Sequence, residues 1–228
     1  MPLLEGLTLH LDVDAVLRGQ GADPGVLRVR SPRLVQAAER ALAEGTALLR
    51  PAVLYEEFLV QARRHQRLLL SGGGVLEGER IASHLARAET VLVIVCTIGD
   101  ALEKRASQAM EQEPVYGLAL DGVGAAAVEA RANAACQHFA EQAAARGLRT
   151  TIPLSPGMAG WPLKESQRQL FALLDSRQIG VALTEHGLML PWKSLSMVLG
   201  VGRHVQRAGR PCDSCEMRET CRYRSPDD

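Results

Sequence analysis

The sequence predicts an α+β fold in which a curved, mixed or antiparallel sheet is flanked by helices. Residues 90–99, TVLVIVCTIG, form a continuous β-branched run ended by glycine, which is typical of a buried strand. Residues 118–147 carry the longest helical pattern of the chain, and Gly147 is placed to end that helix. Helical and strand patterns are mixed without strict βαβ alternation, which favours α+β over α/β.

The first half of the chain is read from its N-terminus. Alternating apolar positions in LTLHLDVDAVL predict a short strand and a loop within residues 1–30. Ser31-Pro32 then opens a helix that runs to about Gly45, with a hydroxyl N-cap followed by proline in the first helical position. VLYEEFLVQA, after Pro51, favours a strand, with the start of a helix as the alternative. SGGG at 71–74 is a turn and not a phosphate-binding loop, because no Lys-Ser/Thr follows it.

The second half continues the mixture of helices and strands. The patterns predict helices over 81–88, 100–111 and 163–175, with Asp100 as an N-cap. They also predict a strand leading into a turn over 149–157, a strand with a loop over 180–191, and a strand over 193–202. We therefore expect an N-terminal strand and loop segment over 1–30, one main domain over 31–205, and a cysteine-containing tail over 206–228.

Charge and hydropathy exclude several functional classes. The chain has 26 Lys+Arg and 26 Asp+Glu, so it has no basic excess for nucleic acid or an anionic membrane. ARRHQR at 62–67 is the strongest basic run, and we interpret it as a solvated helix face. No stretch reaches the roughly 18 apolar residues of a membrane span, and the N-terminus lacks the regions of a signal peptide. We therefore expect a cytoplasmic protein. Neither G-x-S-x-G nor H-E-x-x-H occurs, which argues against a classical hydrolase.

Residues 150–200 are unusually rich in residues that define loops. Ser155-Pro156-Gly157-Met158 and Gly160-Trp161-Pro162 predict a rigid turn with the tryptophan at its lip. Further on, the polar residues are Thr184, Glu185, His186, Lys193, Ser194 and Ser196. On composition alone these segments could equally be two ordinary surface turns.

Three of the five cysteines, Cys212, Cys215 and Cys221, lie in the tail with the spacing C-x2-C-x5-C. Clustered cysteines in a reducing compartment ligate metal more often than they form disulfides. A closed zinc site or a fully cysteine-bound cluster needs a fourth ligand, for which His204, Cys96 and Cys136 are available. The pattern leaves an iron–sulfur cluster, zinc, and redox-active or unligated thiols open.

Residues from about 30 to 200 resemble the activation (reactivation) domain of cobalamin-dependent methionine synthase, in its stand-alone bacterial form. The likeness rests on the order and spacing of short motifs: TIGDALEKRA, LDGVGAAAVEA, Ser155-Pro156-Gly157, Ile179-Gly180, Leu183-Thr184-Glu185, Met189-x-Pro191 and Ser194-x-Ser196. The stand-alone relatives also often end in a cysteine segment followed by Tyr-Arg, as at Tyr223-Arg224.

This resemblance implies the domain's fold, S-adenosylmethionine binding in a shallow groove, and docking on a corrinoid-binding protein or a methionine synthase core. The domain would return an inert cob(II)alamin to methylcobalamin, with an electron from a reductase and a methyl group from S-adenosylmethionine. The ligand-binding residues implied are Glu129, Ser155, Pro156, Gly157, Met158, Glu185 and Ser194. With Cys212, Cys215 and Cys221 as metal ligands, the tail becomes a candidate route for that electron. The alternative is a non-catalytic accessory or assembly subunit with a structural zinc tail.

The sequence departs from the family pattern at three places. Pro153 stands where the family has an arginine, and Met158 stands where it has a tyrosine. A further ligand-contacting tyrosine has no counterpart in LGVGRH at 199–204. An arginine would hold the ligand's carboxylate with two hydrogen bonds. Arg149 and Lys193 are the residues that could take its place.

Overall fold

The computed structural model describes residues 2–206. Its main sheet has six strands in the order β3-β2-β1-β4-β8-β5, and every neighbouring pair is antiparallel. The strands are β1 (Ala52–Arg64), β2 (Arg67–Leu70), β3 (Val75–Glu77), β4 (Thr90–Thr97), β5 (Arg149–Thr150) and β8 (Ser194–Gly202). A separate two-stranded hairpin pairs β6 (Ala182–Leu183) with β7 (Met189–Leu190).

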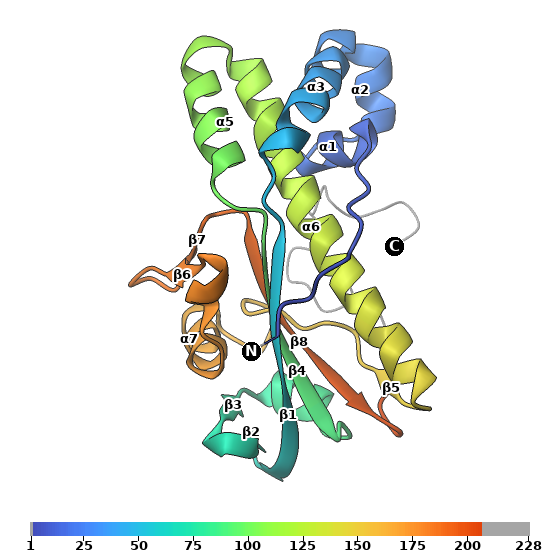
Figure 1. Cartoon of the computed structure of the whole chain (residues 1–228), viewed down its shortest axis with the longest axis vertical. Helices are drawn as coiled ribbons and strands as arrows, with labels where there is room; N and C mark the ends of the chain where they lie inside the picture. Colours follow the sequence, from blue (N-terminus) through green and yellow to red (C-terminus); the bar gives the residue numbers. More distant parts are fainter. Residues whose placement is uncertain (1, 207–228) are drawn as a thin grey trace.

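Seven helices accompany the sheet in this part of the chain. They are α1 (Val13–Gly19), α2 (Pro24–Arg30), α3 (Pro32–Gly45), α4 (Glu79–His84), α5 (Ala101–Gln112), α6 (Pro114–Ala145) and α7 (Leu163–Leu173), with short 3-10 turns η1 (Thr46–Leu48), η2 (Ser71–Gly73) and η3 (Ser176–Ile179). The 32-residue helix α6 is about 48 Å long at the usual rise per residue. Figure 1 shows that it runs from the helices α1, α2, α3 and α5 at one end of the molecule across the sheet at the other.

The two faces of the sheet are covered by different helices, because side chains alternate between the faces along each strand. On one face, Ile94, Cys96 and Met197 pack against the small side chains that α6 presents, among them Ala132 and Ala135. The opposite face packs against α7 and the segments around it, where Val93 and Val198 meet Leu170 and Trp161. A third cluster, formed by α1, α3, α5 and the first half of α6, fills the helical end. The sheet therefore separates an α6 side from an α7 side.

The α+β fold with a curved antiparallel sheet and flanking helices is confirmed. The N-terminal segment differs from its expected form: apart from a single bridge between Leu3 and Leu54, it contains the helices α1 and α2. Despite the alternating pattern in LTLHLDVDAVL, the chain is helical from Val13 onward. The carboxylate of Asp12 caps this helix, accepting a hydrogen bond from the backbone N–H of Ala15 at 2.7 Å. Asp100 precedes α5 as expected, but its side chain makes no capping bond and pairs with Lys104 instead.

None of the described helices, α6 included, combines the length and the apolar character that a membrane span requires.

Candidate functional site

The turn over residues 155–161 begins where the chain leaves the edge of the sheet. Leu154 exchanges two backbone hydrogen bonds with Val198 of β8, at 3.1 and 2.9 Å, and this bridge fixes the start of the turn. The N–H of Gly157 donates to the carbonyl of Trp161 at 2.9 Å, which closes the turn on itself. Gly157 has a backbone φ of +93°, a conformation that residues with a side chain rarely adopt. The sequence thus places a rigid turn beside β8.

The side chain of Trp161 anchors this turn to the core of the protein. The expectation that Trp161 lies at the lip of the turn is wrong. This residue is 1% exposed, and its side chain belongs to the core on the α7 side. Glycine at position 78 makes room for it, because a Cβ there would lie 3.0 Å from Cδ1 of the indole. The indole Nε1–H has no hydrogen-bond partner in the described residues, and a buried donor of this kind is normally satisfied by an ordered water.

Beyond this bridge, one side of β8 has no strand partner among the described residues, although Ser196 is only 3% exposed. We use the name β8 edge for the side of Ser194–Val198 that faces away from β4. On this side, β8 pairs with Arg149, Thr150 and Leu154, and no described strand continues the pairing past Val198. Val198 bonds outward to Leu154, so by the alternation of an antiparallel ladder the N–H and C=O of Ser196 also point to the open edge.

Glu129 lies on α6, on the flank that faces away from β1. Arg131, two residues on, donates to the carbonyls of Leu7 and Leu4 at 2.8 and 3.5 Å, and these follow the β1 side of the sheet. Two positions along a helix correspond to a rotation of about 200° around its axis, so the side chain of Glu129 lies on the opposite flank of α6 from Arg131. Seven residues further, Cys136 lies on the same flank as Glu129, and its Sγ is 3.4 Å from Sδ of Met197 on β8. Glu129 is exposed there.

The chain places Ser155, Pro156, Gly157 and Met158 beside β8 on the α7 side, where Met158 packs against the core, whereas Glu129 lies on α6, which covers the other face of the sheet. Ser194 begins the β8 edge but is 4% exposed, and its hydroxyl lies 2.8 Å from the carbonyl of Pro191 and 3.0 Å from Oγ1 of Thr97. Its hydrogen bonds can hold the start of the β8 edge in position, but its side chain is buried. Glu185 lies in the exposed loop of the β6–β7 hairpin, where its carbonyl accepts from Arg168 of α7, on the α7 side of the sheet. The ligand contacts of all seven residues stay predictions.

Neither cation that could replace the family arginine is free at this edge. Nζ of Lys193 is 2.9 Å from Oδ1 of Asp121 on α6, and the lysine side chain is only 19% exposed. Arg149 pairs with Gly202, four strand positions along β8 from Val198, which places it about 13 Å from the start of the turn. The edge and the Glu129 flank of α6 thus offer backbone groups and a carboxylate, which fit the cationic and hydrogen-bonding parts of S-adenosylmethionine better than its carboxylate.

Two contacts at this site link distant parts of the chain and are not evident in the sequence. Oε1 of Gln167, a residue 3% exposed on α7, accepts from the hydroxyl of Ser196 at 2.8 Å. Asp121, the partner of Lys193, is the single charge in the run LALDGVGAAA, and such an isolated charge is the one signal that the sequence gives. Both contacts fix the start of β8 against a helix on either side of the sheet.

The cysteine ligands Cys212, Cys215 and Cys221 lie outside the described residues, and so does the metal centre expected on them. Residues 2–206 hold no group of three or more His, Cys, Asp or Glu side chains suited to a metal ion. Of the two cysteines in this range, Cys96 is fully buried and burial raises its pKa to about 12, whereas Cys136 is half-buried on α6. Cys96 is therefore a core residue.

Alkylation should separate these two cysteines. At about pH 8 only about one Cys96 thiol in ten thousand is ionised, and the side chain is also inaccessible, so iodoacetamide should leave it unmodified in the folded protein. Peptide mapping by mass spectrometry measures the modification. Cys136 should react first, and both should react in denaturant. Equal rates for the two residues in the folded protein would contradict this assignment.

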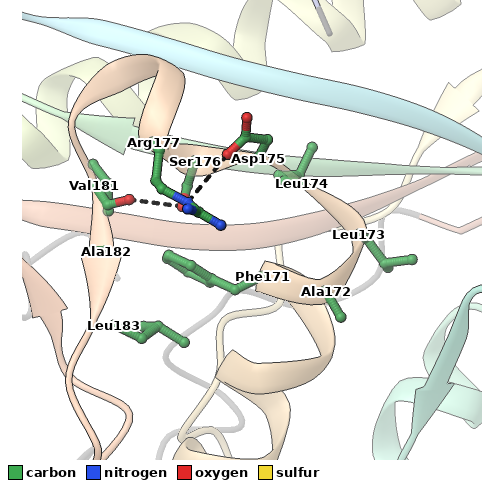
Figure 2. A pocket seen from close by; sticks show the side chains of 10 residues that line it. All are labelled: Phe171, Ala172, Leu173, Leu174, Asp175, Ser176, Arg177, Val181, Ala182 and Leu183. Carbon is green, nitrogen blue, oxygen red and sulfur yellow. Dashed lines mark hydrogen bonds and ion pairs between the residues drawn. The ribbon is translucent and has the colours of Figure 1, made fainter.

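A hollow lies away from this edge, at the C-terminal end of α7. Its volume is about 570 Å³, and Figure 2 shows Phe171, Leu174 and Leu183 around it. Ser176 donates to the carbonyl of Val181 at 2.8 Å, and Arg177 lies 3.6 Å from Asp175 at its rim. None of the residues predicted to bind a ligand lines it. Its walls are mostly aliphatic, and it stays separate from the site at the β8 edge.

The fold is a curled antiparallel sheet with a long helix on one face, in which the β8 edge has no described strand partner beyond Val198. Comparison of sequences finds no matching family and no matching curated protein. Among solved structures, this chain is similar to the "MetH Reactivation Domain bound to AdoHcy", with a TM-score of 0.65. The two share 15% sequence identity, and the match covers 90% of this chain and 79% of that chain. The likeness shows the fold.

Proposed function

We propose that this protein binds S-adenosylmethionine at the β8 edge and reactivates a corrinoid protein by reductive methylation. The observation that carries the proposal is the shared architecture with a reactivation domain that binds AdoHcy, the demethylated form of S-adenosylmethionine. Two placements support it: the 155–158 turn follows the bridge from Leu154 to Val198 of β8, and Glu129 lies on the flank of α6 that carries Cys136, which contacts Met197 of β8.

The groups at this edge and on this flank of α6 suit the parts of the ligand in different ways. Glu129 would face the sulfonium or the ammonium group, since an exposed carboxylate attracts a cation without a burial penalty. The backbone groups of the turn and of Ser196 would bind the polar atoms of the ligand, as an open strand edge offers both donors and acceptors. An edge site leaves one side of the ligand uncovered, as transfer of the methyl group to a cobalt on another protein requires.

In this reaction the partner's cob(II)alamin takes up one electron from a reductase, and the reduced cobalt then accepts the methyl group from the sulfonium. The products are methylcobalamin and S-adenosylhomocysteine. The chain's own contribution would be to hold the methyl donor in line with the cobalt, and such alignment alone can supply a large part of the rate. We propose that the cysteine-bound centre on Cys212, Cys215 and Cys221, as an iron–sulfur cluster, delivers the electron.

The alternative, a non-catalytic accessory subunit with a structural zinc tail, also has an observation in its favour. The edge lacks a free cation for the ligand's carboxylate, because Pro153 replaces the family arginine and Lys193 is paired with Asp121. Iron and zinc analysis after anaerobic purification separates the two versions of the tail. One zinc per chain, with unfolding on Cys212→Ser, would support the accessory role.

Calorimetric titration with S-adenosylmethionine tests the proposed site. Glu129→Gln should weaken binding about tenfold, because a hydrogen-bonded or closely paired charge contributes about 1.5 to 3 kcal/mol. The matched control is Glu141→Gln, an exposed glutamate further along α6 whose carboxylate accepts from Gln137. It should bind as the unchanged protein does. Absence of binding at millimolar ligand would discard S-adenosylmethionine as the methyl donor.

The activity itself is tested by mixing the protein with a cob(II)alamin protein, a reductant and S-adenosylmethionine. The absorption spectrum should convert to that of methylcobalamin only when all components are present. Conversion at an unchanged rate without this protein would overturn the proposed function.

A further inference from the structure

Four exposed arginines lie on segments that come together at the end of the sheet farthest from the helical layer. We call Arg87, Arg146, Arg149 and Arg203 the basic corner. Figure 1 shows this end where the C-terminus of α6, β5 and the end of β8 come together. The corner lies at the opposite end of β8 from Ser194, and so it is separate from the β8 edge.

Backbone contacts hold these arginines close to one another. Arg149 of β5 is the register partner of Gly202, and Arg203 is the next residue after that glycine. The loop that carries Arg87 packs directly on the same glycine, since a Cβ at position 202 would lie 3.1 Å from the Arg87 carbonyl oxygen. Arg146 directly follows the end of α6, three residues before Arg149. Segments from three parts of the chain thus converge on Gly202.

Within residues 2–206, the corner carries four arginines and one nearby carboxylate, that of Glu89. None of its guanidinium groups takes part in an ion pair among residues 2–206. The nearby carboxylate of Glu89 accepts the backbone N–H of Arg203 at 2.8 Å. Some exposed arginines elsewhere are paired, as Arg28 is with Asp14 at 2.6 Å, whereas Arg30 and Arg33 form no ion pair among the described residues either, so the corner is distinguished by its clustering and not by the absence of ion pairs. Because the whole chain is neutral, a locally basic corner implies a net negative remainder.

We propose that the basic corner is a docking surface for a protein partner that presents an acidic face. Unpaired arginines at the surface attract carboxylates, bind them with two parallel hydrogen bonds, and increase the rate of association. A nucleic acid fits less well. Four arginines neutralise few phosphates, and the described segments 84–89, 146–151 and 200–206 contain no Phe, Tyr or Trp on which a base could stack. This proposal does not depend on S-adenosylmethionine binding.

Fluorescence anisotropy with two labelled probes tests the proposal on the full-length chain. The probes are an oligoglutamate peptide and a single-stranded oligonucleotide of equal charge. At low ionic strength the peptide should bind, and the double variant Arg87→Glu/Arg149→Glu should weaken that binding at least about tenfold. The matched control is Arg30→Glu/Arg33→Glu, which reverses two exposed arginines at the helical end and should leave binding unchanged. Circular dichroism checks that both variants fold.

Three results decide whether the peptide binds at the basic corner. Amide chemical shifts in ¹⁵N-labelled protein should move for Gly202, Glu89 and Thr150 when the peptide is added, which would support the assigned surface. Equal loss of binding in the two double variants would overturn it, since the attraction would then depend on overall charge. Tighter binding of the oligonucleotide than of the peptide would also overturn it, in favour of a nucleic-acid surface.

Discussion

Trp161→Ala is expected to lower the free energy of unfolding by about 4 kcal/mol. The indole is among the largest fully buried side chains, and its loss leaves a cavity between α4, α7 and the sheet. The backbone of Trp161 also closes the 155–161 turn, through the bonds to Gly157 and Met158 at 2.9 Å. Chemical denaturation followed by circular dichroism measures the change. We expect S-adenosylmethionine binding to weaken as well, because the turn loses its anchor.

Trp161→Phe is the matched control for this prediction. The indole Nε1 has no hydrogen-bond partner among residues 2–206, so phenylalanine removes volume without breaking a hydrogen bond seen there. Its cost should stay near 1 to 2 kcal/mol, and the turn should keep its shape. A phenylalanine variant as unstable as the alanine variant would show that Nε1 makes a bond essential to the fold, for example through an ordered water.

Strands and helices with strong periodic patterns were predictable from the sequence. The β-branched run at 90–99 forms β4, which is buried on both faces because α6 and α7 cover it. The longest helical pattern forms α6, and the helix starts at Pro114, a position suited to proline because its missing N–H has no partner there. In both segments, local preference and tertiary burial favour the same structure.

Burial at the turn could not be predicted in the same way. Proline and glycine around Trp161 indicate a surface turn, and Gly157 and Gly160 are exposed as that pattern suggests. The tryptophan itself points inward because the loop at Gly78 leaves space for it, and that loop is more than eighty positions away. Sequence patterns report the backbone preference of a turn, whereas the burial of one side chain depends on such distant packing.

The candidate site shows the same division. The sequence indicates the turn at 155–158 and the carboxylate of Glu129 as separate features. Their positions relative to β8 follow from the register of Leu154 with Val198 and from the contact of Cys136 on α6 with Met197. The unpaired N–H and C=O of Ser196 follow from the end of strand pairing at Val198. These features depend on strand pairing and on how α6 packs against the sheet, and local patterns fix neither.

The long helix α6 carries Glu129, so its packing against α1 should also matter for the site. The two helices approach at a pair of glycines, where a Cβ on Gly19 would lie 2.4 Å from the carbonyl oxygen of Gly122. A backbone atom cannot rotate away as a side chain can. Gly19→Ala should therefore force the helices apart and lower the free energy of unfolding by about 3 kcal/mol, the upper part of the range for overpacking.

Gly25→Ala is the control for this packing effect, because the added methyl group there meets only Oδ1 of Asp23, at 3.3 Å. Alanine also favours a helix over glycine by up to about 1 kcal/mol, so this variant should be neutral or slightly more stable. Thermal and chemical denaturation compare the two. If Gly19→Ala were equally harmless, α1 would not pack on α6 at this point, and the position of Glu129 would not depend on the helical layer.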